Sequence, residues 1–347
     1  MLAQFMAHPP IGFAVELSPQ GMPAFVAPFD LLTTADDELR RRVAALPLYR
    51  WWGKALRWRT RFAGTTVSEY APLPRAVSPV ALAQGLKTVY ARECKLLVVK
   101  DIAQDSPLLS EADNAYARAF ASACAAEGYV LLEGQALAWV PIDFSSDDDY
   151  LSRLSSGRRK NIRRKLRSRA DLDIEIVRTG DARFNDEATL AEFYTLFDNV
   201  YAQSEIHFDR LSADFFRALL RDAETAGVVF VYRYAGQMIG WNLCYEEDNK
   251  LIDKYIGFAY PQARDHNLYF VSWMHNLDYA RQKGLTHYVA GWTDPEVKSF
   301  LGASMTFTRH AVYARNPILR ALLRKLGSHF ESDRQWQSKT EASDAQS

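Results

Sequence analysis

The sequence predicts an α+β fold in which mixed, mostly antiparallel twisted sheets are flanked by helices. The chain of 347 residues is 48% hydrophobic and 13% aromatic, which suffices to bury a large core, and its length suggests two domains. Residues 228–258 alternate three apolar runs with short turns at 235–236 and 247–249, the pattern of an antiparallel meander. Amphipathic helical patterns precede and follow this meander.

The elements of the second half follow in a clear order. Apolar residues at helical spacing predict a helix over 187–202 and another that begins near Ser212. After the meander we expect a helix over 267–283, which Gly284 ends, a strand over 285–291, a short helix over 295–301 and a last strand over 305–314. Residues 331–347 are polar and predict a disordered tail.

The first half has a similar mixture of elements. Strand-like runs occur at 13–17, 24–32, 95–100 and 129–142, and helical patterns occur at 79–92 and 111–127. The stretch 143–150 separates the two halves. We therefore divide the chain into a domain over 1–148, a domain over 149–330 and the tail over 331–347.

Residues 155–170 concentrate positive charge in a chain whose 42 Lys and Arg balance 42 Asp and Glu. If Gly157 ends the preceding turn and Arg158 opens a helix, Ile162 and Leu166 form a narrow buried stripe and basic residues cover the rest. Like charges at this density repel one another, and this repulsion is tolerated best where an anion lies across the helix. We therefore expect a phosphate-bearing ligand. The alternative is a solvated surface helix neutralised by acidic residues at 147–149 and 171–175.

Composition also restricts the class of protein. Zero net charge argues against a general nucleic-acid coat, and we expect no DNA partner. Cys94, Cys124 and Cys244 are odd in number and widely spaced, which predicts reduced core thiols. The histidines show no ligand spacing, so we expect no metal site. No signal-peptide pattern opens the sequence and no apolar run approaches the ~18 residues of a membrane span, so we expect a cytoplasmic protein without membrane insertion.

Residues from about 149 to 314 resemble the GNAT-related domain of the Fem-type peptidyltransferases and the BioF2-like acetyltransferases. The matching features are the helix L-S-S-G-R-R-K-N-I-R-R-K-L-R at 154–167, the meander, and the segment G-W-T-D-P-E-V-K-S-F-L-G-A at 291–303. The resemblance implies tandem GNAT-like domains, of which the first is a degenerate copy. The alternative is a single GNAT domain with an unrelated α+β extension.

This resemblance implies acyl transfer from a thioester or an ester to an amine. It implies that Lys298 is the family's lysine near the reacting centre. It also implies that five residues of the basic helix bind a phosphorylated substrate: Arg158, Arg159, Asn161, Arg163 and Lys165. The candidate general bases are Asp253, Asp294 and Glu296, although a structural partner for Lys254 or Arg233 explains Asp253 about as well. The candidate general acids are Tyr255, Tyr288 and Tyr313. Trp292, with Trp241 and Trp273, lines a substrate channel or belongs to the core.

The segment after the meander departs from the usual coenzyme A grip. Acetyl-CoA enzymes of this superfamily hold the pyrophosphate with a Gly-rich loop at a helix start. Here Gln262 is in place and Arg264 follows, but Asp265 and Asn267 occupy the positions of the glycines.

Three functions therefore remain open, in this order. The first is transfer from acyl-CoA, a co-substrate and not a tightly bound cofactor, to a small-molecule or amino-sugar amine acceptor. The second is Fem-like transfer from charged tRNA to a cell-wall precursor or related amine. The third is a catalytically silent module that binds a polyanion.

Overall fold

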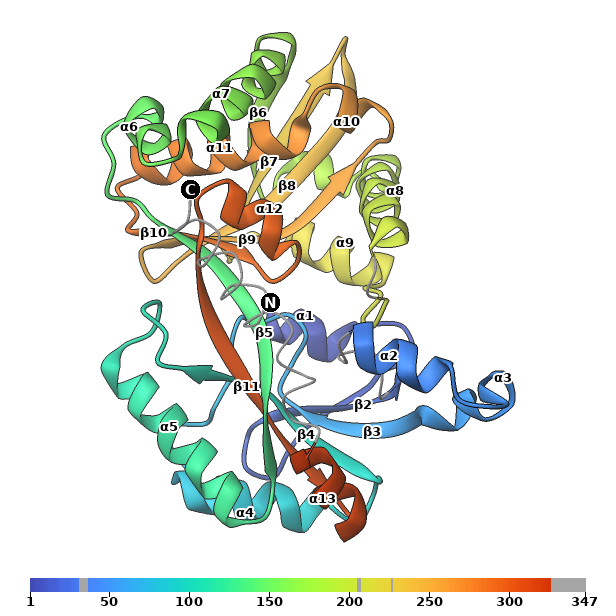
Figure 1. Ribbon diagram of the computed structural model, residues 1–347. Coiled ribbons are helices and arrows are strands. Elements are labelled where there is room, and N and C mark those ends of the chain that lie inside the picture. The colour runs from blue at the N-terminus through green and yellow to red at the C-terminus, as the bar shows by residue number, and fades with distance from the viewer. Residues whose placement is uncertain (31–36, 205–206, 226, 326–347) are drawn as a thin grey trace. The chain divides into compact units, whose positions relative to one another are not determined.

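The computed structural model describes residues 1–30, 37–204, 207–225 and 227–325 of the chain (Figure 1). The chain divides into two compact units. Unit 1 holds Met1, Ala3–Pro10 and Leu137–Met305. Among the described residues, unit 2 holds Leu2, residues 11–136 and residues 306–325. The bounds of these compact units differ from the predicted domains at 1–148 and 149–330. Whether those two domains fold independently stays a prediction. The predicted tail at 331–347 lies outside the described residues.

Unit 1 is built on a mostly antiparallel sheet with the strand order β5-β10-β9-β8-β7-β6. Antiparallel neighbours are β6 (Asp173–Arg178), β7 (Gly227–Tyr234), β8 (Gln237–Glu247) and β9 (Lys250–Phe258). Strand β10 (His287–Gly291) runs parallel to β9, and the end of β5 (Val130–Pro141) pairs antiparallel with β10. The predicted meander and the predicted mixed sheet are confirmed.

Helices flank both faces of this sheet. Helix α8 (Glu187–Gln203) packs along β8 and β9 together with α9 (Ala213–Arg221), and α11 (Leu268–Gln282) covers the core of the other face. Ser212 caps α9 through its side chain, as predicted. The other helices of unit 1 are α1 (Leu2–Ala7), α6 (Asp147–Ser152), α7 (Ser156–Lys165), α10 (Gln262–Asp265), α12 (Pro295–Phe300) and the 3-10 helices η2 (Leu166–Asp171) and η3 (Ala182–Asn185).

Unit 2 carries the other strands of this 11-stranded sheet, in the order β1-β2-β3-β4-β11-β5. Its strands are β1 (Ala14–Leu17), β2 (Pro23–Asp30), β3 (Arg57–Ala63), β4 (Leu96–Gln104) and β11 (Ser304–Ala314). The helices α4 (Pro79–Tyr90) and α5 (Glu111–Ala126) pack together and contribute to the core of this unit. Short helical segments α2 (Asp37–Ala44), α3 (Tyr49–Trp52) and η1 (Gly53–Leu56) connect β2 to β3, and α13 (Pro317–Lys325) follows β11.

The two halves of the sequence exchange strands. The strand predicted at 305–314 is β11, and it pairs antiparallel with β4 of the first half. In return, the end of β5 joins β10 of the second half. Hydrophobic alternation marks a strand without naming its partner, so local sequence patterns do not contain this exchange.

Several local predictions need correction or can be confirmed. The basic helix begins at Ser156 and not at Arg158, because the Ser155 side chain accepts from the Arg158 amide and caps it, so that Gly157 lies inside the helix. Strands β3 and β6 were not predicted, since charged residues interrupt their apolar alternation. The three cysteines are free and buried, as expected. None of the helices in the described part of the chain is long and apolar enough to cross a bilayer.

Candidate functional site

Lys298 is a buried lysine, with 5% of its surface exposed, on the short helix α12 of unit 1. The turn that leads into this helix uses left-handed backbone at Gly291, with φ 81°, and at Asp294, with φ 53°. A Cβ atom on Gly291 would lie 3.8 Å from Lys298 Nζ and 3.8 Å from the main-chain oxygen of Asp253. The ammonium group is therefore held at the end of β10, beside β9.

The pKa values of Lys298 and Asp253 are both shifted toward neutral pH, so the difference between them is smaller than usual. Burial lowers the pKa of Lys298 to about 8, although the charges of Asp253 and Asp294 act in the opposite direction. Burial raises the pKa of Asp253 to about 6, although hydrogen bonds from Tyr288 and Asn242 and the charge of Lys298 oppose the shift. Pairs of groups with shifted pKa values gather at catalytic sites because proton transfer near neutral pH needs them.

Three buried side chains hold the Asp253 carboxylate. Asn242 Nδ2 donates to Asp253 Oδ1 at 2.6 Å, and the Tyr288 hydroxyl donates to Oδ2 at 2.8 Å. Asn276 Nδ2 lies 3.3 Å from Oδ2 and 2.7 Å from Asn242 Oδ1, which links the group into one network. Because buried amides and phenols are costly unless paired, this network fixes the carboxylate in one position.

Sequence reasoning missed two members of this network. Asn242 lies in the run W-N-L-C-Y of β8, and Asn276 lies in the run W-M-H-N-L of α11. Both are almost fully buried, at 0% and 1% exposure. An asparagine inside a strongly apolar run was the available signal, although nothing in the sequence says that the two residues meet.

Tyr255 does not join Lys298 and Asp253. Leu243 of β8 opposes Tyr255, whereas the next residue, Cys244, opposes Asp253, so Lys254 is the extra residue of a β-bulge. The bulge turns Tyr255 to the face of the sheet opposite to Asp253. There its ring contacts three phenylalanines of α8 and α9, which are Phe197, Phe215 and Phe216. Of the predicted tyrosines, Tyr288 is the one that contacts Asp253.

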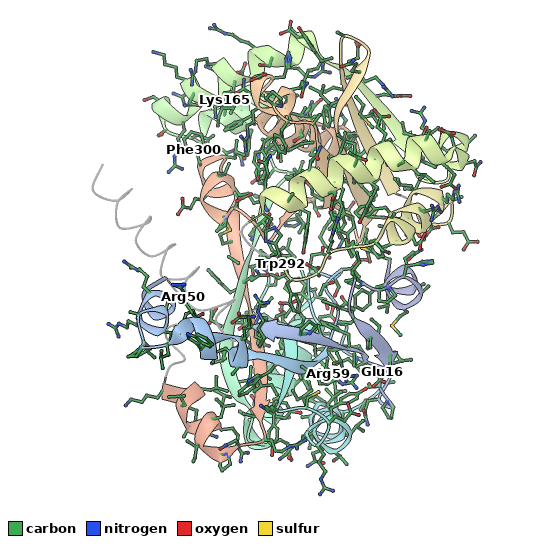
Figure 2. The ribbon with its side chains drawn as sticks, turned by 90° about the vertical axis from the view of Figure 1, so that its right-hand side faces the viewer. Glu16, Arg50, Arg59, Lys165, Trp292 and Phe300 are labelled. Atoms are coloured by element: carbon green, nitrogen blue, oxygen red, sulfur yellow. The ribbon has the colours of Figure 1, made fainter. Side chains whose placement is uncertain are left out.

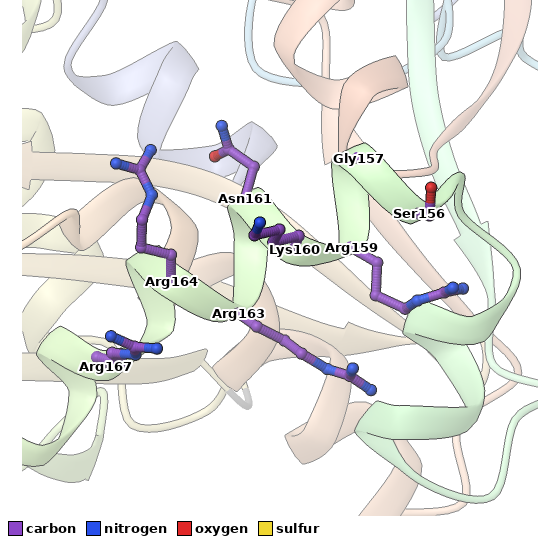
Figure 3. Close-up of a pocket in the computed structure, with 8 residues that line it drawn as sticks. All are labelled: Ser156, Gly157, Arg159, Lys160, Asn161, Arg163, Arg164 and Arg167. Carbon is purple, nitrogen blue, oxygen red and sulfur yellow. The ribbon is translucent and has the colours of Figure 1, made fainter.

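Helix α7 presents most of its positive charge to solvent. Ile162 is fully buried and Leu166 is half-buried, so the predicted apolar stripe is confirmed. Eight residues of α7 and η2 line an open hollow of about 630 Å³: Ser156, Gly157, Arg159, Lys160, Asn161, Arg163, Arg164 and Arg167 (Figure 3). One basic segment supplies the whole lining, which is suited to an anion that lies along the helix.

Part of this charge has partners within the chain. Arg163 pairs with Asp148 of α6 at 2.8 Å, and Arg159 donates to the main-chain oxygens of Ser152 and Leu154 at 3.2 Å each. These contacts match the alternative of intramolecular counter-charges for Arg163 and a structural role for Arg159. Lys160 and Arg164 are exposed.

Helix α7 also contacts the helix that carries Lys298. Arg158 Nη1 donates to the Ser299 main-chain oxygen at 3.5 Å, and its guanidinium lies 5.9 Å from the centre of the Phe300 ring. Lys165 lies 3.5 Å above the ring of Phe270, which meets the Phe300 ring edge-on at 6.5 Å (Figure 2). The structure thus brings the basic helix and the Lys298 helix together.

The segment around α10 does not offer a free cradle of backbone N–H groups. The amides from Ala263 to Asn267 all donate to carbonyls of their own turn. Gln262 and Arg264 are exposed, and the Arg264 guanidinium stacks on Tyr260 and bonds to Gln203. Trp292 is half-buried and follows Gly291 at the end of β10 (Figure 2).

Side chains that could bind a metal do not gather in the described ranges of the chain. No group of three or more His, Cys, Asp or Glu side chains there could hold an ion. His287 is half-buried, and burial lowers its pKa.

Comparison with known proteins gives a family. A family model described as FemAB-like, peptidoglycan biosynthesis/recognition, matches residues 74–344, which confirms the resemblance read from the basic helix and from 291–303. No curated protein sequence matches the chain.

Solved structures share the fold at low sequence identity. A C-terminal domain from Agrobacterium fabrum, described as part of a lysylphosphatidylglycerol synthetase, is 14% identical with a TM-score of 0.53, over 90% of this chain and 86% of that chain. L-PGS from Bacillus licheniformis is 9% identical with a TM-score of 0.53, over 94% and 95%. FemX is 13% identical with a TM-score of 0.51, over 93% and 97%.

Proposed function

We propose that this chain, which belongs to the FemAB-like family, transfers an aminoacyl group from charged tRNA to the amine of a peptidoglycan precursor. The observation that carries the proposal is the pair of buried Lys298 on helix α12 and half-buried Asp253 on strand β9, with the basic helix α7 docked on α12 through Arg158. Oppositely charged groups that are partly shielded from water suit a transfer whose transition state carries charge on a carbonyl oxygen.

We choose between charged tRNA and acyl-CoA as the donor by asking how the protein would bind the phosphates of each. The amides from Ala263 to Asn267 are already used in local turns, so they are not free to hold the pyrophosphate of coenzyme A. Helix α7 instead offers long cationic side chains along an open surface, which suits an extended phosphate backbone. Both features favour tRNA over acyl-CoA, which remains the second candidate donor.

The roles of the residues follow from their charge states. Asp253, as a carboxylate, accepts the proton that the acceptor amine loses as its nitrogen bonds to the acyl carbon. Its Oδ1 atom takes one hydrogen bond from Asn242, and a carboxylate oxygen has room for about two. Lys298, as an ammonium, stabilises the negative charge on the carbonyl oxygen until the ester bond to the ribose breaks. The released ribose oxygen takes the proton that Asp253 accepted, which gives a neutral hydroxyl and restores the carboxylate.

A direct transfer assay tests this proposal. The purified protein is incubated with a soluble peptidoglycan precursor and either charged tRNA with labelled amino acids or labelled acetyl-CoA. We expect label to move from tRNA to the precursor and not from acetyl-CoA. Transfer from acetyl-CoA alone would establish the second candidate, and tRNA binding without any transfer would identify a silent binding module.

Reversal of exposed charges on α7 is expected to weaken tRNA binding. We expect Lys160→Glu and Arg164→Glu each to lower the affinity at least tenfold and to flatten its dependence on salt, because each removes a cation near the phosphates. Equilibrium binding at two salt concentrations measures both effects. These positions are better suited than Arg159 and Arg163, whose side chains bind other parts of the chain.

The matched control is Lys283→Glu, which reverses an exposed lysine at the end of α11. Its affinity for tRNA should equal that of the unaltered protein. Equal affinities for all three variants would show that α7 is a solvated surface helix.

A further inference from the structure

Two segments of unit 2 leave its sheet at the same end. Strands β3 and β4 are parallel, and β2 and β11 run antiparallel to them. The connection between β2 and β3 and the helix α13 after β11 therefore both emerge beside the first residues of β3 and β4, as Figure 1 shows. We call residues 39–59 and 315–325 together the basic end of unit 2.

The basic end is strongly positive in a chain of zero net charge. Its two segments contain eleven Lys or Arg residues. The connection between β2 and β3 also carries three acidic residues, at 36–38, and no acidic residue occurs from 39 to 68. Arg57 is 72% exposed and forms an ion pair with Asp30 at 3.4 Å. Arg50 and Arg59 are exposed (Figure 2). Positive charge at this density attracts an anionic partner.

The same end exposes large apolar side chains. In the connection between β2 and β3, Trp51 is 84% exposed, Leu48 72% and Leu46 51%. On α13, Ile318 is 77% exposed and Leu322 is 48% exposed, one helical turn apart on one face. Apolar groups that cluster on a surface mark an interaction site.

The backbone at Leu48 supports the same reading. Leu48 has φ 60°, in the left-handed region that a branched residue such as leucine rarely adopts and that asparagine and glycine accept more easily. Residues with strained backbone of this kind cluster at functional sites. Here it presents an aliphatic side chain to solvent.

The combination of chemistries favours a lipid surface over other partners. An RNA backbone would use the cations, but exposed Leu and Ile side chains would gain nothing from phosphates and sugars. A second copy of the chain would bring two strongly positive surfaces together. An anionic bilayer satisfies both features, because its head groups attract Lys and Arg while its interface accepts Trp and Leu.

We propose that the basic end of unit 2 binds the surface of an anionic membrane, with Trp51, Leu48 and Ile318 in the interface and the arginines at the head groups. In this proposal the basic end lies on the bilayer surface without crossing it, and the structure of unit 1 does not change. This binding is separate from the proposed transfer activity, which the variants below retain toward a soluble acceptor.

Vesicle flotation tests the proposal with the full chain. Vesicles of phosphatidylcholine alone are compared with vesicles of equal parts phosphatidylcholine and phosphatidylserine, at low and high salt. We expect binding to the anionic vesicles only, weakened by salt. Leu48→Asn with Trp51→Gln should lower the partition coefficient about tenfold or more, and Arg50→Gln should lower it about fivefold.

The matched control is Leu17→Gln, which removes a side chain of 58% exposure on β1 of the same unit, beside Glu16. It should bind vesicles like the unaltered protein. Leu48→Asn suits the left-handed backbone, so a melting curve should show this variant folded. Absence of binding to anionic vesicles would overturn the proposal. So would vesicle binding that is lost in the Lys160→Glu or Arg164→Glu variants of α7. The proposal is also overturned if the basic-end variants bind tRNA more weakly but still bind vesicles.

Discussion

Replacement of Lys298 by methionine is expected to lower the turnover of the transfer reaction by about 10²–10³-fold, the cost of losing one group that stabilises an oxyanion. Methionine keeps the length and apolar stem of the side chain, so the packing of α12 should persist. The unbranched thioether removes only the ammonium group, which lies at the end of β10. Single-turnover kinetics with charged tRNA would measure the loss.

The same variant should be more stable than the unaltered protein near neutral pH. Because the folded-state pKa of Lys298, about 8, lies below its ordinary value of 10.5, the folded protein binds this proton less tightly than the unfolded chain does. The neutral Lys298 therefore gives the folded protein its full free energy of unfolding above pH 10.5, and part of that free energy is lost as the pH falls through 8. Below that pH the buried charge costs up to about 3 kcal/mol, which Lys298→Met removes.

Lys283→Met is the matched control, since Lys283 is exposed at the end of α11. Its turnover should not change, and its free energy of unfolding should fall by no more than about 1 kcal/mol, because the contact of the Lys283 ammonium with the Tyr279 ring is lost. Unchanged turnover in Lys298→Met would remove Lys298 from the reacting centre, whereas lost turnover together with lost stability would indicate a packing defect.

The elements that the sequence predicted best are those fixed by neighbouring residues. Helix α8 follows from apolar residues at helical spacing, α9 from its Ser212 cap, and the meander from short turns between apolar runs. The family resemblance likewise rested on contiguous motifs. Each signal lies within a few residues of the element it predicts.

The features that the sequence did not reveal depend on contacts between distant residues. Asn242 and Asn276 meet only because α11 crosses β8 and β9. The bulge at Lys254 places Asp253 and Tyr255 on opposite faces, although residues two apart in a regular strand share one face. A single inserted residue thus separated two candidates that the sequence grouped together, and it left Tyr288 beside the carboxylate.

The dependence of kcat/KM on pH should be bell-shaped, with limbs near pH 6 and pH 8. Activity rises as Asp253 loses its proton, at a pKa of about 6, and falls as Lys298 loses its own, at about 8. Both groups are in their working charge states only between these values. A single limb, or limbs far from these values, would contradict the pairing of base and ammonium.

Tyr288→Phe tests the assignment of the lower limb. The Tyr288 hydroxyl donates to Asp253 Oδ2 at 2.8 Å and so stabilises the carboxylate. Its removal should raise the pKa of Asp253 and move the lower limb up by about one pH unit, while the upper limb stays in place. Tyr279→Phe is the control, because the Tyr279 hydroxyl donates to Glu246, away from Asp253. A merely structural role for Tyr288 would lower the maximum rate without moving either limb, so the position of the lower limb decides whether this network sets the protonation of the base.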